Sequence, residues 1–211
     1  MSLFAKFYDR CMAATERGGL SELRTELLAT LTTEHPEPEV LELGAGTGVN
    51  LDHYPPGLAR LVQTEPDPGM LTRLTHRARG RGFEAAGASA LKLPYANASF
   101  DAVVITLVLC TVLDPSLALR EAARVLRPGG RLLFIEHVGS EEASVLRWQQ
   151  RIEPIWKLVA GGCCLTRDPR PLLAQAGLEL ESCTPGHLPN APRFVSPMIR
   201  GVARRAVYSA H

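Results

Sequence analysis

The chain has 211 residues, of which 45% are hydrophobic and 21% are charged. These values are close to those of an average globular domain and exclude a disordered, collagen-like or coiled-coil chain. Twenty-three Lys and Arg residues balance twenty-two Asp and Glu residues, which leaves a formal net charge of +1. So small a net charge gives no general attraction to nucleic acid. We therefore expect a single domain over residues 1–211, with no nucleic-acid partner.

The sequence also argues against a membrane span and a metal site. The longest nearly apolar run covers residues 102–113, whereas a membrane helix needs roughly twenty residues. Charged residues near the N-terminus interrupt the apolar core of a secretory signal. The five cysteines are odd in number and include no C-x-x-C pair, which argues against a disulfide framework and a zinc site. The sequence predicts a reduced, cytoplasmic protein without a metal.

The predicted elements begin with one or two amphipathic helices over residues 1–31, where Leu3, Phe4, Phe7 and Cys11 share one face. We expect this face to pack on the domain; contact with a membrane is the alternative. Short apolar runs then alternate with helical segments, the pattern of a parallel sheet wrapped by helices. The expected strands cover residues 40–43, 60–64, 83–87, 100–106 and 132–135, and the expected helices cover residues 68–79 and 115–126.

The last third of the chain is predicted to differ from the alternating strands and helices of the centre. Residues 139–175 have a mostly helical pattern that Gly161 and Gly162 interrupt. Residues 178–183 and 194–202 are predicted to form two final strands and an antiparallel end to the sheet. The sequence pattern therefore predicts an α/β fold.

A glycine loop follows the first expected strand. Gly44, Gly46 and Gly48 let the backbone turn sharply and approach a ligand, and a helix that begins nearby would add free N–H groups. A dinucleotide loop of the G-x-G-x-x-G type would have its third glycine at Val49, and no P-loop lysine follows Gly48.

Glu65 lies nineteen positions after Gly46, at the end of the second expected strand. A nucleotide-binding fold places a carboxylate there to accept hydrogen bonds from the two ribose hydroxyls. The alternative is that Glu65 simply faces solvent. The strand, the glycine loop and the spacing together favour a ligand that contains adenosine.

Five motifs then resemble the class I S-adenosylmethionine-dependent methyltransferases, in the family's order and spacing. They are ELGAGTG at residues 42–48, EPD at 65–67, LPY at 93–95, SFDAVV at 99–104 and LRPGGRLLFIEH at 126–137. The resemblance implies a Rossmann-like fold, namely a seven-stranded, mostly parallel sheet with an antiparallel last strand and helices on both faces. It implies S-adenosyl-L-methionine as cofactor, S-adenosyl-L-homocysteine as product and no metal.

The resemblance also implies which residues hold the cofactor. The glycine loop would lie under the methionine part, Glu65 would hold the ribose, and Ser89 stands where many relatives have Asp facing the adenine. The expected cofactor-binding residues are Glu42, Gly44, Ala45, Gly46, Gly48, Asn50, Glu65, Pro66, Met70, Ser89, Ala90, Leu91 and Thr106. Residues 1–31 would form a helical lid, residues 36–138 the cofactor-binding core and residues 139–211 the substrate side.

The C-terminal third is similar to the methyltransferase-like seven family, whose animal members are thiol S-methyltransferases. The similar segments are WQQ at residues 148–150, EPIWK at 153–157 and GGCCLTR at 161–167, with LVLCTV at 107–112 and FIEHV at 134–138. The resemblance favours a small thiol as acceptor. The animal members begin with a hydrophobic membrane anchor that this sequence lacks, so membrane association is not carried over.

On the acceptor side, His137 follows the fifth strand and is the candidate general base; the alternative is that its ring only supports a neighbouring loop. Candidate substrate contacts are Phe7, Tyr8, Cys110 and Trp148. Cys163 and Cys164 are expected to pack or to form part of the substrate wall. Two other functions stay open: methylation of oxygen, nitrogen or carbon on a quinone-like, lipid or natural-product acceptor, and a catalytically silent regulatory protein that binds the cofactor.

Overall fold

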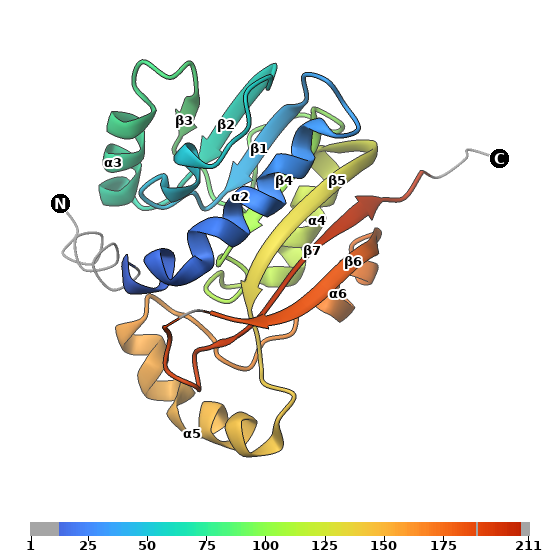
Figure 1. The fold of residues 1–211 in the computed structure, drawn as a ribbon. Helices are drawn as coiled ribbons and strands as arrows, with labels where there is room; N and C mark the ends of the chain where they lie inside the picture. The colour runs from blue at the N-terminus through green and yellow to red at the C-terminus, as the bar shows by residue number, and fades with distance from the viewer. Residues whose placement is uncertain (1–12, 189, 208–211) are drawn as a thin grey trace.

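The fold is a single seven-stranded sheet flanked by helices (Figure 1). The computed structural model describes residues 13–188 and 190–207. The strands follow the spatial order β3-β2-β1-β4-β5-β7-β6. Strand β7 is antiparallel to β5 and β6, and the pairs from β3 to β5 are parallel. The strands are β1 (Glu39–Leu43), β2 (Arg60–Thr64), β3 (Glu84–Ala86), β4 (Phe100–Thr106), β5 (Leu126–His137), β6 (Leu178–His187) and β7 (Pro197–Arg205).

The helices begin where capping chemistry allows. Asp67 accepts a hydrogen bond from the Met70 N–H (2.8 Å) at the start of α3 (Pro68–Ala78), and Asp114 does the same for Leu117 at the start of α4 (Pro115–Val125). In both helices a proline occupies the first position. The other helical elements are η1 (Glu16–Leu20), α2 (Ser21–Ala29), η2 (Thr30–Thr32), η3 (Val49–Asp52), α5 (Ala143–Val159) and α6 (Arg170–Gln175).

Helices cover both faces of the sheet because neighbouring strand residues point to opposite sides. Leu41 and Val103 pack with α4 and α6, whereas Val40 and Val104 pack with α2. Figure 1 shows α2 crossing one face and α4 behind the other. The predicted Rossmann-like α/β fold, with its seven strands and one antiparallel strand, is confirmed. Among the described residues, no helix is long and apolar enough to cross a bilayer.

Some predicted boundaries are wrong. β5 begins at Leu126, because Leu126 pairs with Phe100 before a register shift carries the strand through residues 127–130. The last strand covers Pro197–Arg205, so both of its ends lie three residues after the predicted ends at 194 and 202. The helix expected after the glycine loop is only the short turn η3, since Pro55 and Pro56 follow closely and lack the N–H groups that a helix needs.

The described part of the expected lid packs directly on the sheet. Leu20, Leu27 and Leu28 are buried against β1, β4 and β5 in one apolar cluster. The N-terminal region therefore contributes to the core from residue 20 onward. Phe7 and Tyr8, the proposed substrate contacts, lie outside the described residues.

Candidate active site

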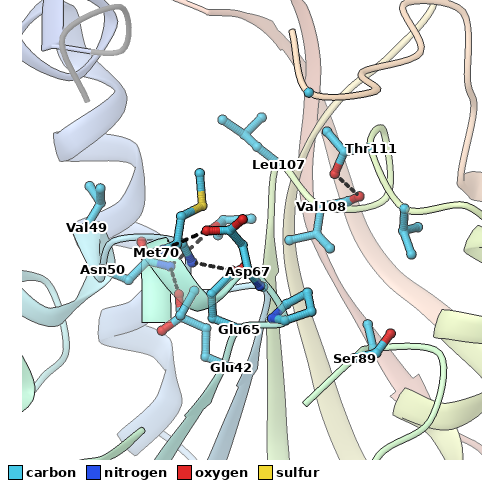
Figure 2. Close-up of a pocket in the computed structure, with 18 of the residues that line it drawn as sticks. Glu42, Val49, Asn50, Glu65, Asp67, Met70, Ser89, Leu107, Val108 and Thr111 are labelled. Atoms are coloured by element: carbon cyan, nitrogen blue, oxygen red, sulfur yellow. Dashed lines mark hydrogen bonds between the residues drawn. The ribbon is translucent and has the colours of Figure 1, made fainter. Parts of the chain in front are cut away.

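A cavity of about 620 Å³ opens at the carboxyl ends of β1, β2 and β4 (Figure 2). From β1 the chain adds β2 and β3 on one side of the sheet and then crosses to add β4 on the other side of β1. The cavity therefore lies where the strand order reverses. Open α/β sheets bind ligands at this point. Its volume is in the range of cofactor and substrate pockets.

Twelve of the thirteen residues expected to bind the cofactor line this cavity. They are Glu42, Gly44, Ala45, Gly46, Asn50, Glu65, Pro66, Met70, Ser89, Ala90, Leu91 and Thr106. Gly48 is not among the lining residues: its α-carbon faces the Leu51 and Leu74 side chains, which a Cβ would approach to 2.8 and 2.9 Å. Gly48 therefore shapes the loop from behind.

The glycine loop keeps the cavity open because it has no side chains at two strained positions. Gly44 and Gly46 have φ angles of +62° and +58°, which side chains rarely adopt. A Cβ on Gly44 would lie 2.7 Å from Val108 Cγ2. A Cβ on Gly46 would meet only Met70 Sδ, at 4.0 Å, and would occupy the space of the cavity itself. The loop is a cradle for a ligand that needs close backbone contact.

Glu65 is positioned by the backbone on both sides. Its Oε2 accepts the Gly46 N–H and its Oε1 accepts the Asp67 N–H, both at 2.8 Å. Burial raises the pKa of Glu65, while these two backbone hydrogen bonds act in the opposite direction. Each carboxylate oxygen keeps a further lone pair, so the group can accept two hydroxyl donors from a ligand.

A buried polar network forms the floor of the cavity. Asn50 Nδ2 donates to Glu42 Oε1 (2.7 Å) and to Thr106 Oγ1 (3.0 Å). Tyr54 and Gln63 also donate to Glu42, whose pKa is raised because the carboxyl is fully buried. Figure 2 shows Glu42 and Asn50 together below the opening. This floor offers fixed polar groups at the methionine end of the expected cofactor site.

Arg24 belongs to the same network, and the sequence reasoning missed it. Its Nη1 donates to Asn50 Oδ1 (2.7 Å) and Thr106 Oγ1 (3.0 Å), and its Nη2 forms an ion pair with Glu16 at 3.0 Å. The side chain is 5% exposed and lines the cavity. A signal was available: Arg24 lies on the helix face that carries Leu20, Leu27 and Leu28, and a cation on an apolar face needs a buried partner.

The other end of the cavity is apolar, and two turns form it. The first follows β4 and includes Val108 and Thr111, which Figure 2 shows across the cavity from Asn50. The second follows α5, at residues 160–161. The lining residues here are Leu107, Val108, Thr111, Val112, Leu113, Ala160 and Gly161. None of these described residues has a titratable side chain.

Glu136 and Arg167 hold the first turn through its backbone. Glu136 accepts the N–H groups of Val108, Leu109 and Cys110 at 2.8, 2.9 and 3.2 Å. The Arg167 guanidinium donates to the carbonyls of residues 109 and 112. Complete burial raises the pKa of Glu136 to about 7, although the three N–H donors favour its charged form. The shape of the wall is therefore set by two polar side chains behind it, the buried Glu136 and the partly buried Arg167.

The remaining sequence candidates do not lie on the described wall of the main cavity. His137 and Cys110 line a separate cavity of about 40 Å³ behind the turn, together with Glu136 and Arg167. Trp148 is 61% exposed on α5 and lines neither cavity. The geometry thus gives His137 no direct access to the large cavity, and its role as a base stays a prediction.

Comparisons with known proteins show to which family this chain belongs. The family model described as "Methyltransferase domain" matches residues 41–134. Human thiol S-methyltransferase TMT1B is 44% identical over 176 residues, which cover 80% of this chain and 69% of that protein. Human thiol S-methyltransferase TMT1A is 35% identical over 208 residues, covering 95% and 82%.

A solved structure of geranyl diphosphate C-methyltransferase from Streptomyces coelicolor, which contains S-adenosyl-L-homocysteine, has the same fold. Its TM-score is 0.70 at 14% identity, with 88% of this chain and 76% of that chain covered. Among the described residues, no group of three His, Cys, Asp or Glu side chains could hold a metal ion. The chain belongs to the class I S-adenosylmethionine-dependent methyltransferases, in the family of the thiol S-methyltransferases TMT1A and TMT1B.

Proposed function

We propose that this methyltransferase transfers the methyl group of S-adenosylmethionine to the sulfur of a small apolar thiol. The observation that carries the proposal is the acceptor end of the cavity, where the described lining residues are apolar apart from the Thr111 hydroxyl, which donates to the Val108 carbonyl, and offer no general base. An acceptor in such a pocket must ionise without help. A thiol has an ordinary pKa of about 8.5 and a phenol about 10, so a thiol supplies far more nucleophile at neutral pH.

Four features of the cavity support S-adenosylmethionine as its ligand. The Glu65 carboxylate can accept both ribose hydroxyls, and the side-chain-free cradle at Gly46 admits close backbone contact. Asn50 and Arg24 place polar and positively charged groups at the opposite end, where the methionine carboxylate and ammonium would lie. Residues 89–91 and Met70 would border the adenine.

When bound, S-adenosylmethionine supplies an electrophilic methyl group on a sulfonium. The chain's own contribution is alignment: the glycine loop and Glu65 fix one reactant, and the two turns confine the other in line with it. The apolar wall formed by Leu107, Val108 and Val112 excludes water, which leaves a thiolate poorly solvated and more reactive. When bound, the cofactor would offer its methyl group to a thiolate held against this wall, and the expected products are a thioether and S-adenosylhomocysteine.

The test offers cofactor with a labelled methyl group to acceptors matched in shape, such as thiophenol and phenol, or benzyl thiol and benzyl alcohol. We expect labelled thioethers, with the rate rising with pH until the thiol is ionised. The Gly46→Val variant, whose side chain fills the cradle, is the background control.

Two results would contradict the proposal. Equal or faster methylation of the oxygen acceptors would move the assignment to quinone-like or phenolic substrates. Tight binding of the cofactor without turnover on any acceptor would indicate a silent regulatory protein.

A further inference from the structure

Two cysteines from distant parts of the sequence meet behind the acceptor wall. Cys110 lies in the turn after β4, and Cys163 lies in the turn after α5. The two turns are tied by the hydrogen bond from the Cys164 N–H to the Cys110 carbonyl, at 2.7 Å. The side chains of Cys110 and Cys163 lie close enough for each to shift the pKa of the other. Cys110 is 3% exposed, whereas Cys163 is partly exposed.

Two aromatic side chains beside this pair carry buried ring nitrogens that have no hydrogen-bond partner. His137 is 3% exposed, and neither of its ring nitrogens has a partner. The buried Nε1 of Trp156 has none either. Both rings lie close enough to Cys163 to lower the pKa of its thiol. Buried N–H groups are costly when unpaired, so a sulfur that carries negative charge would be their natural partner.

The surroundings shift the pKa values of the two thiols in opposite directions. Donation from the Cys110 thiol, helped by His137 and Trp156, lowers the pKa of Cys163 well below its ordinary value. The pKa of Cys110 is raised, because it donates to Cys163 and because it is buried beside the Glu136 carboxyl, with only Arg167 acting in the opposite direction. Cys163 is therefore both the accessible sulfur and the better nucleophile.

The neighbouring cysteine does not share these contacts. Cys164 Sγ faces the Gly162 carbonyl at 3.6 Å and lies near Lys157. Cys183 lies on β6, and burial raises the pKa of its thiol. These two residues are matched internal controls for the reactivity of Cys163.

We propose that Cys163 and Cys110 form a thiol–disulfide exchange site that takes low-molecular-weight organic disulfides. The Cys163 thiolate attacks one sulfur of the disulfide RSSR, which forms a mixed disulfide on Cys163 and releases RS⁻. The Cys110 sulfur then attacks Cys163, a second RS⁻ leaves, and this thiolate takes the Cys110 proton. The protein loses one proton and two electrons from its thiol and thiolate, and RSSR is reduced to RS⁻ and RSH.

The site is adjacent to the methyl-transfer cavity. Thr111 and Val112, beside Cys110, and Ala160 and Gly161, before Cys163, all line the cavity. A Cys110–Cys163 bond would fix the two turns to each other and stiffen the acceptor wall. If the acceptor is a thiol, as the proposed function holds, RSSR is its oxidised form, so the site would respond to the redox state of the substrate itself.

The experiment incubates the reduced full-length protein with 2-hydroxyethyl disulfide under native conditions and maps the cysteines by peptide mass spectrometry. We expect the wild type to lose two hydrogen atoms, about 2 Da, through a Cys110–Cys163 cross-link that dithiothreitol reverses. The Cys110→Ser variant lacks the second thiol and should retain a hydroxyethylthio group on Cys163. Cys163→Ser should give neither product, and Cys164→Ser should behave as the wild type does.

A second measurement needs no variant. Brief treatment of the wild type with iodoacetamide at pH 6 should label Cys163 at least about tenfold faster than Cys183, because the pKa of the Cys163 thiol is lowered and that of the Cys183 thiol is raised. Equal labelling rates, a cross-link between any other pair, or a Cys163→Ser protein that still forms the disulfide would overturn the proposal. All these readouts are independent of methyl transfer, so they fail or succeed separately from the proposed function.

Discussion

Replacing Glu65 by alanine tests the central contact of the proposed cofactor site. The carboxylate is held by the Gly46 and Asp67 N–H groups at 2.8 Å each, and its remaining lone pairs point into the cavity. A hydrogen bond to a charged group contributes about 1.5–3 kcal/mol. Since each 1.4 kcal/mol is tenfold in affinity, the Kd for S-adenosylhomocysteine should rise roughly 10- to 150-fold. Glu65→Gln keeps the shape and one acceptor oxygen, so its loss should be smaller.

Isothermal titration calorimetry with S-adenosylhomocysteine measures this change without turnover. The control is Glu84→Ala on β3, which removes an exposed carboxylate paired with Arg60 at 2.9 Å and should leave the Kd unchanged. An affinity of folded Glu65→Ala within about threefold of the wild type would refute a ribose contact by Glu65, because so small a change is below the weakest hydrogen bond to a charged group.

Three further predictions follow from the same geometry. Gly46→Val should abolish binding of S-adenosylhomocysteine in calorimetry. The control is Gly57→Val, at a φ of +88° with no atom near its Cβ, which should bind normally. Retained binding by Gly46→Val would refute close contact between the ligand and the Gly46 backbone. Burial raises the pKa of Glu136 from 4.5 to about 7, so the protonated carboxyl stabilises the folded state at low pH. The free energy of unfolding should fall by about 3 kcal/mol as the pH rises from 4.5 to about 7. Urea unfolding from pH 5 to 8 should show most of this fall in the free energy of unfolding for the wild type and not for Glu136→Gln. The same pH dependence of stability in both proteins would contradict the raised pKa. His137→Ala should slow all thiols by the same factor, because the ring lies outside the large cavity; a loss of about 10²–10⁴ that shrinks with acidic thiols would instead identify a general base.

The cofactor side could be predicted from the sequence because its signals are local. The loop at Gly44 and Gly46 directly follows a strand, and the carboxylate of Glu65 ends the neighbouring strand, so spacing alone places them at one edge of the sheet. The N-caps Asp67 and Asp114 are likewise read from adjacent residues. Motifs of this kind need no knowledge of tertiary packing.

Contacts between distant residues could not be predicted in this way, at either end of the cavity. In the polar floor, Arg24 reaches Thr106 across 82 positions of the sequence, and behind the acceptor wall Arg167 reaches Leu109 across 58. His137 is the last residue of β5, as its place in the sequence suggests, and its ring lines the small cavity and not the large one. Side-chain direction at the end of a buried strand is decided by packing, which spacing does not encode.

The anchoring of the turn after β4 has a consequence for how this enzyme can diversify. Glu136 and Arg167 form these hydrogen bonds with backbone N–H and carbonyl groups of residues 108–112. These contacts do not depend on which side chains the turn carries. Leu113, which is 90% exposed at the rim, can therefore be exchanged for larger or smaller residues with little effect on folding, whereas Val112 also packs against the core. Acceptor preference is thus open to stepwise drift or to directed evolution, with a library confined to a few positions of one segment.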